Sequence, residues 1–214
     1  MTLLFRLLLP VLVLGLSACC TCGREESANR TAAAVAASSV VRLETSLGNI
    51  DILLNETQAP ISTRNFLTYV DSGRYDGVIF HRVIPGFVIQ SGGHTPDLAE
   101  RAKTEGGGED KDPKIRNEWG NGLTNVRGSV GMARDADPDS ATRQFYINLA
   151  DNARLDIARE VSGNAGYAVF AQVVAGMEVV DAIAAVATSD HPDREMANVP
   201  IEPVVLIRAR RVAE

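Results

Sequence analysis

Apolar residues recur at every second position over residues 41–43 and again over 50–54, on either side of Gly48-Asn49. This period of two, interrupted by a residue pair that favours turns, predicts a β-hairpin over residues 40–54. β-Branched and aromatic residues mark further segments as short strands. These segments cover residues 78–90, with a bend at Pro85-Gly86, and residues 129–133, 144–149, 167–174 and 204–210.

The last strand allows a specific prediction about its two faces. Because successive side chains of a strand point to opposite sides, we expect Val205, Ile207 and Ala209 to share the apolar face. Arg211 would be the first charged residue in that series. The pattern therefore predicts that the strand ends before Arg211.

Two other segments have apolar residues at helical spacing. Pro60 suits the first turn of a helix, where its missing N–H costs no hydrogen bond, and Gly73 suits the helix end. A second amphipathic helix is expected over residues 177–187. The buried stripes are expected to contain Ile61, Phe66, Tyr69 and Val70 in the first helix, and Val179, Val180 and Ile183 in the second.

Many short strands together with two helices are typical of a barrel that is covered by helices. We therefore expect residues 40–214 to form one mainly β domain, a closed eight-stranded antiparallel barrel capped by two α-helices. Residues 91–127, which include Gly106-Gly107-Gly108, show little periodicity. We interpret this stretch as a surface loop beside the functional face.

The composition excludes several classes of function. A net charge of −6 argues against a nucleic-acid partner, since binding to phosphate backbones requires a basic face. The three cysteines all lie within residues 19–22, so no disulfide framework can hold the domain. The only histidines are His81, His94 and His191, which leaves few candidate ligands for a metal site. We therefore expect no metal and no cofactor.

The N-terminus has the pattern of an export signal. Arg6 precedes an apolar run that is about half the ~20 residues needed to span a bilayer. Leu16-Ser17-Ala18-Cys19 resembles the bacterial lipobox, in which the cysteine is acylated and becomes the new N-terminus. The alternative is ordinary secretory cleavage. We expect a lipoprotein signal peptide over residues 1–18, a flexible tether over 19–39, and a lipid anchor on Cys19 that holds the domain at the bacterial cell envelope, in the periplasm or at the surface.

Several long motifs occur in a fixed order along the domain. The segment from Phe80 to Gly93 reads FHRVIPGFVIQSGG, Gly128 to Arg134 reads GSVGMAR, and Ser140 to Asn148 reads SATRQFYIN. Leu155-Asp156 and the GYAVF segment over 166–170 follow. Together they resemble the cyclophilin-type peptidyl-prolyl cis-trans isomerases, most closely the bacterial periplasmic branch. The resemblance implies an enzyme that acts on proline-containing polypeptides, with its active face on the outside of the barrel.

The resemblance also implies roles for individual residues. The arginine of the Phe-His-Arg segment, Arg82, is expected to be catalytic. An arginine stays charged at every working pH and presents a planar fork of donors, which suits it to bind the imide nitrogen as its lone pair leaves conjugation. The backbone of Ala133-Arg134 is expected to bind the extended peptide. The remaining substrate-binding residues are expected to be Phe87, Val88, Gln90, Gln144, Tyr146, Leu155 and Tyr167.

Two departures from the better-known eukaryotic pattern matter here. Tyr146 replaces a frequent phenylalanine and adds a hydroxyl at the pocket wall. Arg154 stands where an aromatic residue, often tryptophan, packs against the inhibitor cyclosporin in the family. We therefore expect weak cyclosporin binding.

Alternatives of a different class remain open from the sequence. The domain could be a surface binding or adhesion module whose isomerase activity is incidental, or a lipocalin-like barrel that carries a small apolar ligand. The intact set of Arg82, Phe87, Gln90 and Gln144 favours the isomerase, because a pure binder has no need of the arginine. We expect a monomer.

Overall fold

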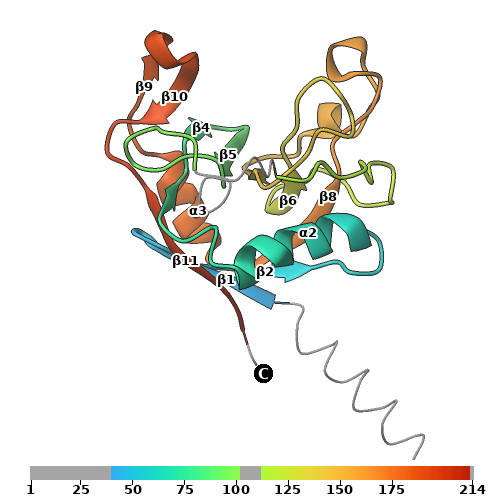
Figure 1. Ribbon diagram of the computed structural model, residues 1–214, viewed down its shortest axis with the longest axis horizontal. Coiled ribbons are helices and arrows are strands. Elements are labelled where there is room, and N and C mark those ends of the chain that lie inside the picture. The colour runs from blue at the N-terminus through green and yellow to red at the C-terminus, as the bar shows by residue number, and fades with distance from the viewer. Residues whose placement is uncertain (1–39, 102–111, 213–214) are drawn as a thin grey trace, which may run out of the picture. The chain divides into compact units, whose positions relative to one another are not determined.

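The computed structural model describes residues 40–101 and 112–212, which lie in one compact unit of the chain. Figure 1 shows the arrangement of its elements. The two α-helices are α2 (Pro60–Asp71) and α3 (Met177–Ala184). The strands are β1 (Val40–Thr45), β2 (Gly48–Leu54), β3 (Val78–Ile79), β4 (Arg82–Ile84), β5 (Val88–Ser91), β6 (Ser129–Met132), β7 (Phe145–Asn148), β8 (Val169–Ala175), β9 (Thr188–His191), β10 (Met196–Pro200) and β11 (Val205–Arg211).

The expected signal peptide, tether and Cys19 anchor fall outside the described residues, as do Gly106-Gly107-Gly108. Among the helices formed by residues 40–101 and 112–212, none has the length and apolar character required to cross a membrane.

Nine strands form one antiparallel sheet in the order β3-β11-β1-β2-β8-β6-β7-β5-β4. Its two end strands, β3 and β4, are successive in the chain and are joined by Phe80 and His81. The backbone N–H of Phe80 donates to the carbonyl of Val204, which directly precedes β11. The backbone N–H of His81 donates to the carbonyl of Gln90 in β5. A mainly β fold with two helices is confirmed, but the sheet is open and curled, with nine strands instead of a closed barrel of eight.

The interior of the curled sheet holds one large apolar core. Val83, Ile89, Ile147 and Val130 are paired across β4, β5, β7 and β6 and are all fully buried. Phe66 of α2 packs edge-on against Phe145, with 5.4 Å between ring centroids. The helix α3 buries Val180 and Ile183 in the same core. Both helices therefore bury apolar faces against the inside of the sheet.

The ends of α2 agree with the sequence prediction. Pro60 is the first residue, and the backbone N–H groups of Ile61 and Ser62 donate to the carboxylate of Glu118 at 3.0 and 2.8 Å. A carboxylate at this position satisfies free donors and complements the positive end of the helix dipole. Gly73 follows the helix with a φ of +66°, a conformation that suits glycine.

The first hairpin turns at Ser46-Leu47, because Thr45 pairs directly with Gly48, so the predicted turn at Gly48-Asn49 is wrong. Gly48 lies under α3, where an added Cβ would approach Val179 Cγ2 to 2.8 Å. The glycine therefore permits close helix packing and does not form the turn.

The predicted apolar face of the last strand is wrong at Ile207 and correct at Ala209. Leu206 and Ala209 are buried, whereas Ile207 is 55% exposed. Thr45 pairs with Leu206 and Glu44 pairs with Arg208, so Ile207 has no partner and forms a bulge. A bulge of one residue reverses which side chains face the core. Arg211 remains within β11 and pairs with Val41, so the strand does not end before it.

The paired strands β9 and β10 were not expected. They form a separate two-stranded sheet, which lies at the top left of Figure 1. The segment is polar and its register shifts between Met196 and Val199, so it offers no regular alternation. The second helix is also shorter than expected and ends at Ala184.

Candidate active site

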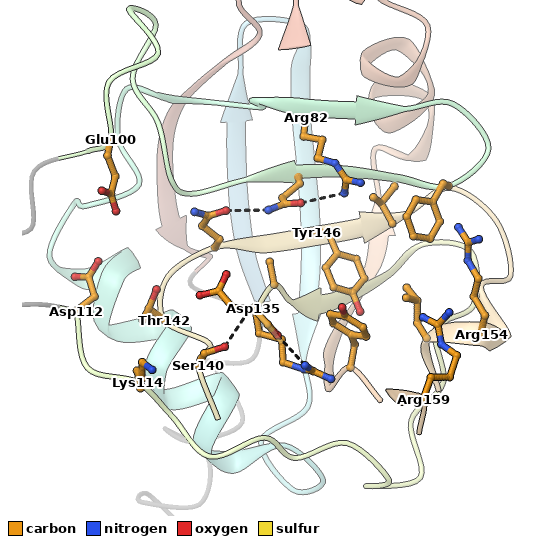
Figure 2. A pocket seen from close by; sticks show the side chains of 18 of the residues that line it. Arg82, Glu100, Asp112, Lys114, Asp135, Ser140, Thr142, Tyr146, Arg154 and Arg159 are labelled. Atoms are coloured by element: carbon orange, nitrogen blue, oxygen red, sulfur yellow. Dashed lines mark hydrogen bonds between the residues drawn. The ribbon is translucent and has the colours of Figure 1, made fainter. Parts of the chain in front are cut away.

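A cavity of about 900 Å³ lies on the outer face of the sheet (Figure 2). Every residue of the domain that was predicted from the sequence to be catalytic or substrate-binding lines this cavity. The cavity is lined in part by Arg82, Phe87, Val88, Gln90, Ala133, Arg134, Gln144, Tyr146, Leu155 and Tyr167. Residues up to 85 positions apart in the chain thus share one pocket.

The register between neighbouring strands explains how β4, β5, β7 and β6 form one surface of the cavity. Arg82 pairs with Gln90, Gln90 with Tyr146, and Tyr146 with Gly131, so the four residues form a row across β4, β5, β7 and β6. The adjacent row faces the core, which places this row outside. Gly131 is required because an added Cβ would lie 2.3 Å from the Tyr146 ring.

Hydrogen bonds connect the polar side chains of this row, Arg82 and Gln90, to each other and to the neighbouring Gln144. Gln90 Nε2 donates to Gln144 Oε1 at 2.8 Å, and Arg82 Nη1 lies 3.4 Å from Gln90 Oε1. Partial burial lowers the pKa of Arg82 from its ordinary value. No carboxylate pairs with Arg82 among the described residues. Its guanidinium therefore faces the cavity with donors available to a ligand.

Next to the arginine lies an apolar patch that is separate from the main core. Val88, Tyr146 and Leu155 are buried in it, and Phe87, Ala133 and Tyr167 pack around them. The Tyr146 and Tyr167 rings meet nearly at right angles, with 6.3 Å between centroids. Such a concave patch beside a few directed donors is the usual form of a small ligand site.

The Tyr146 hydroxyl does not point into the cavity but is buried behind it. It donates to Asn125 Oδ1 at 2.6 Å, and Asn125 Nδ2 donates to Asp156 Oδ1 at 2.6 Å. Asn148 Nδ2 also donates to Asn125 Oδ1, at 3.1 Å. Burial raises the pKa of Tyr146 well above its ordinary value. This network fixes the pocket wall, and sequence reasoning missed it because Asn125 lies in the aperiodic 91–127 stretch.

The 91–127 stretch is therefore more than a surface loop. Asn125 is 1% exposed, and Asp112, Pro113 and Lys114 line the cavity. Its expected place beside the functional face is correct, but its interpretation as a purely surface segment is wrong. The hydrogen bonds of the Asn125 side chain to Tyr146 and Asp156 hold this part of the stretch in the interior of the domain.

The side chain of Arg134 has a supporting role. Its Nη2 donates to the carbonyls of Ser162, Ala165 and Gly166 at 2.8–3.0 Å, and its guanidinium lies 4.3 Å from the Tyr167 ring centroid. The backbone N–H and C=O of Arg134 have no hydrogen-bond partner within residues 40–101 and 112–212. The main chain at Arg134 thus offers a free edge to an extended peptide.

His81 is not placed to act as a base. It is 5% exposed and packs against His94 with the two rings tilted by 51° and 4.5 Å between their centroids. Burial is the largest cause that lowers the pKa of His81 to about 3, and His94 adds to the effect. His81 is therefore neutral and forms part of the interior beneath the site.

Comparison with known proteins agrees with this geometry. The model of the family described as cyclophilin type peptidyl-prolyl cis-trans isomerase/CLD matches residues 40–210. The chain belongs to this family. Peptidyl-prolyl cis-trans isomerase A of Dickeya dadantii (strain 3937) is 46% identical over 177 residues, 83% of this chain and 86% of that protein. Peptidyl-prolyl cis-trans isomerase B of Escherichia coli (strain K12) is 44% identical over 170 residues, 78% of this chain and 99% of that protein.

A solved structure supports the fold of this cyclophilin. The crystal structure of a Cryptosporidium parvum cyclophilin-type isomerase in the presence of the dipeptide Ala-Pro matches with a TM-score of 0.63. The match covers 82% of this chain and 99% of that one, at 22% identity. With relatives at 44–48% identity named as isomerases, this cyclophilin is a peptidyl-prolyl cis-trans isomerase.

The cavity of this cyclophilin extends beyond the predicted residues, and its two ends differ in charge. Figure 2 shows Glu100 and Asp112 at one end and Arg154 and Arg159 at the other. Arg154 was noted as a departure from the family pattern, whereas Arg159 was missed because it precedes an irregular 3-10 turn (Glu160–Ser162). Within the described residues, no group of three or more His, Cys, Asp or Glu side chains could hold a metal ion.

Proposed function

We propose that this cyclophilin accelerates Xaa-Pro rotation in exported or unfolded polypeptides, with Arg82 as its catalytic residue. Rotation about the imide bond crosses a barrier of ~18–20 kcal/mol, because the nitrogen lone pair is shared with the carbonyl. The reaction breaks no bond. A guanidinium that donates to the nitrogen as it becomes pyramidal stabilises the twisted form more than either planar isomer.

The hydrogen bond from Arg82 is only part of the mechanism. A charge-assisted bond contributes about 1.5–3 kcal/mol, and each tenfold in rate requires about 1.36 kcal/mol. The rest comes from holding the proline ring in the patch around Val88, Tyr146 and Leu155, while Gln90, Gln144 and the Arg134 main chain orient the flanking peptide. Phe87, Ala133 and Tyr167 close the sides of this pocket.

The proposed cellular setting rests on the N-terminal pattern. Cleavage and acylation at Cys19 would tether the domain to a bacterial envelope membrane through residues 19–39, in the periplasm or at the surface. Newly exported chains with slow proline steps would be its substrates there. The protein acts as a monomer in this proposal, since one chain supplies the complete pocket.

The observation that carries the mechanism is the position of Arg82, which pairs with no carboxylate among residues 40–101 and 112–212 and is linked through Gln90 to Tyr146 of the apolar patch. The test is the cis/trans exchange rate of an Ala-Pro tetrapeptide, measured by NMR with wild-type protein, Arg82→Ala and Arg82→Lys. Both substitutions should remove most of the acceleration, since a lysine cannot reproduce the planar fork. Arg64→Gln, on the exposed side of α2, is the matched control and should retain it. An Arg82→Ala protein with the wild-type rate would refute the mechanism.

A further inference from the structure

The acidic end of the cavity is internally compensated. Arg143 is 2% exposed and lies 3.1 Å from the Asp112 carboxylate and 3.6 Å from that of Glu100. Asp112 also pairs with Arg74 at 3.0 Å. The two acidic side chains thus already have cationic partners from the protein.

The opposite end of the cavity lacks such compensation. Arg154 and Arg159 form no ion pair with a carboxylate in the part of the chain that the structure describes. Asp156, the acidic residue that lies between them in the sequence, instead accepts hydrogen bonds from the side chain and backbone of Asn125 at 2.6 and 2.9 Å. Figure 2 shows both arginines at the same end of the pocket. We call this pair the cationic rim.

The two arginines of the cationic rim differ in exposure, since Arg154 is exposed and Arg159 is half-buried. The Arg154 guanidinium carbon lies over the Phe87 ring, 4.3 Å from its centroid, and the Arg154 side chain donates no hydrogen bond to another of the described residues. The Arg159 carbonyl accepts from the backbone N–H groups of Ser162 and Asn164. Arg159 Nε is buried and has no hydrogen-bond partner among residues 40–101 and 112–212. Both arginines line the cavity without a carboxylate partner among the described residues, so an anion bound at this end would neutralise charge that the protein leaves uncompensated.

We infer that the cationic rim binds an anionic side chain, a carboxylate or a phosphate, that flanks the substrate proline. This inference rests on the proposed function, since it assigns a specificity to the same pocket. An extended chain advances about 3.3 Å per residue, and Arg154 lies on the Phe87 ring at the wall of the pocket, so a side chain within two residues of the proline would extend toward the rim. The whole chain carries a net charge of −6, which would repel an anionic peptide. A preference for such peptides would therefore come from the local charge of the rim.

The test compares peptides that differ only in charge. Exchange rates are measured by NMR for Ala-Ala-Pro-Glu and Ala-Ala-Pro-Gln, for Ala-Glu-Pro-Ala and Ala-Gln-Pro-Ala, and for the matching phosphoserine and serine pairs. At one of the two flanking positions, wild-type protein should show an acid-to-amide ratio in kcat/KM of about fivefold, equivalent to about 1 kcal/mol. The glutamate and phosphoserine pairs distinguish a carboxylate from a phosphate as the preferred anion.

Substitutions assign the effect to the cationic rim. In Arg154→Gln/Arg159→Gln the acid-to-amide ratio should fall to about one, and in the control Arg64→Gln it should stay at the wild-type value. Raising the salt concentration should lower the wild-type ratio, because the rim is partly exposed. A wild-type ratio near one at both positions, with neutral peptides still isomerised, would overturn this inference and leave the proposed function intact. A ratio that persists in the double variant would also overturn it.

Discussion

The buried His81 makes the stability of the domain depend on pH. Its native pKa of about 3 lies below the ordinary value of 6.5, because burial disfavours the charged ring and the neighbouring His94 adds electrostatic repulsion. Between these two values the unfolded chain binds a proton that the native state does not. Stability contributed by the neutral ring is therefore complete above pH 6.5 and is lost as the pH falls toward 3.

The size of this effect follows from linkage. Each pH unit inside the window costs up to about 1.36 kcal/mol, so moving from pH 7.5 to 4.5 should remove roughly 2–3 kcal/mol through His81 alone. Arginine partners lower the pKa values of aspartates such as Asp51 and Asp71, and protonation of these aspartates also lowers the stability of the domain as the pH falls. The contribution of His81 must therefore be isolated by substitution.

The assay is urea unfolding at pH 7.5 and pH 4.5, followed by the fluorescence of the single tryptophan, Trp119, and by circular dichroism. His81→Gln removes the titrating ring, while the aspartate pairs remain. Between pH 7.5 and pH 4.5 the variant should therefore lose less unfolding free energy than the wild-type protein, by roughly 2–3 kcal/mol. His191→Gln, in the β9–β10 hairpin, is the matched control and should follow wild type. Equal pH dependence in wild type and His81→Gln would refute the reasoning.

Three further predictions concern the pocket wall, the rim and the N-terminus. Tyr146→Phe removes the buried hydrogen bond to Asn125 and should lower the unfolding free energy by about 1–2 kcal/mol in urea titrations; unchanged stability would show that the network does not hold the wall. Arg154→Trp should bind cyclosporin at least about tenfold more tightly than wild type, because an apolar ligand no longer has to desolvate the guanidinium, and equal affinity by calorimetry would contradict this. Cys19→Ser should leave the precursor unlipidated or release a soluble product, and a wild-type protein whose N-terminal Cys19 is free and unmodified in mass spectrometry would contradict the anchor.

Local sequence patterns were sufficient to predict the elements in which apolar residues recur at regular spacing or a proline or glycine fixes the backbone. The helix that starts at Pro60 and is followed by Gly73, and the bend at Pro85-Gly86 between β4 and β5, follow from backbone chemistry alone. The pocket residues were predicted through ordered motifs, and the strand register then explains why Arg82, Gln90 and Tyr146 share a face.

Features that depend on tertiary contacts could not be predicted in this way. The bulge at Ile207 depends on pairing with β1, and the glycine at 48 depends on the approach of Val179 from α3. Asn125 has no periodic neighbours, yet it is buried because Tyr146, Asn148 and Asp156 supply its partners. Arg159 likewise gains its position from an irregular turn.

The central claim is that the Arg82 guanidinium stabilises the twisted imide and not merely the bound peptide. The most direct measurement is NMR line-shape analysis of an isotope-labelled Ala-Pro peptide titrated with wild-type and Arg82→Ala protein, which gives the Kd and the rate of interconversion on the protein separately. The account predicts a Kd that changes by no more than about threefold and an interconversion rate that falls at least about tenfold, the loss of one charge-assisted bond in the transition state. A weaker Kd with an unchanged interconversion rate would show that Arg82 only binds substrate and would contradict the account.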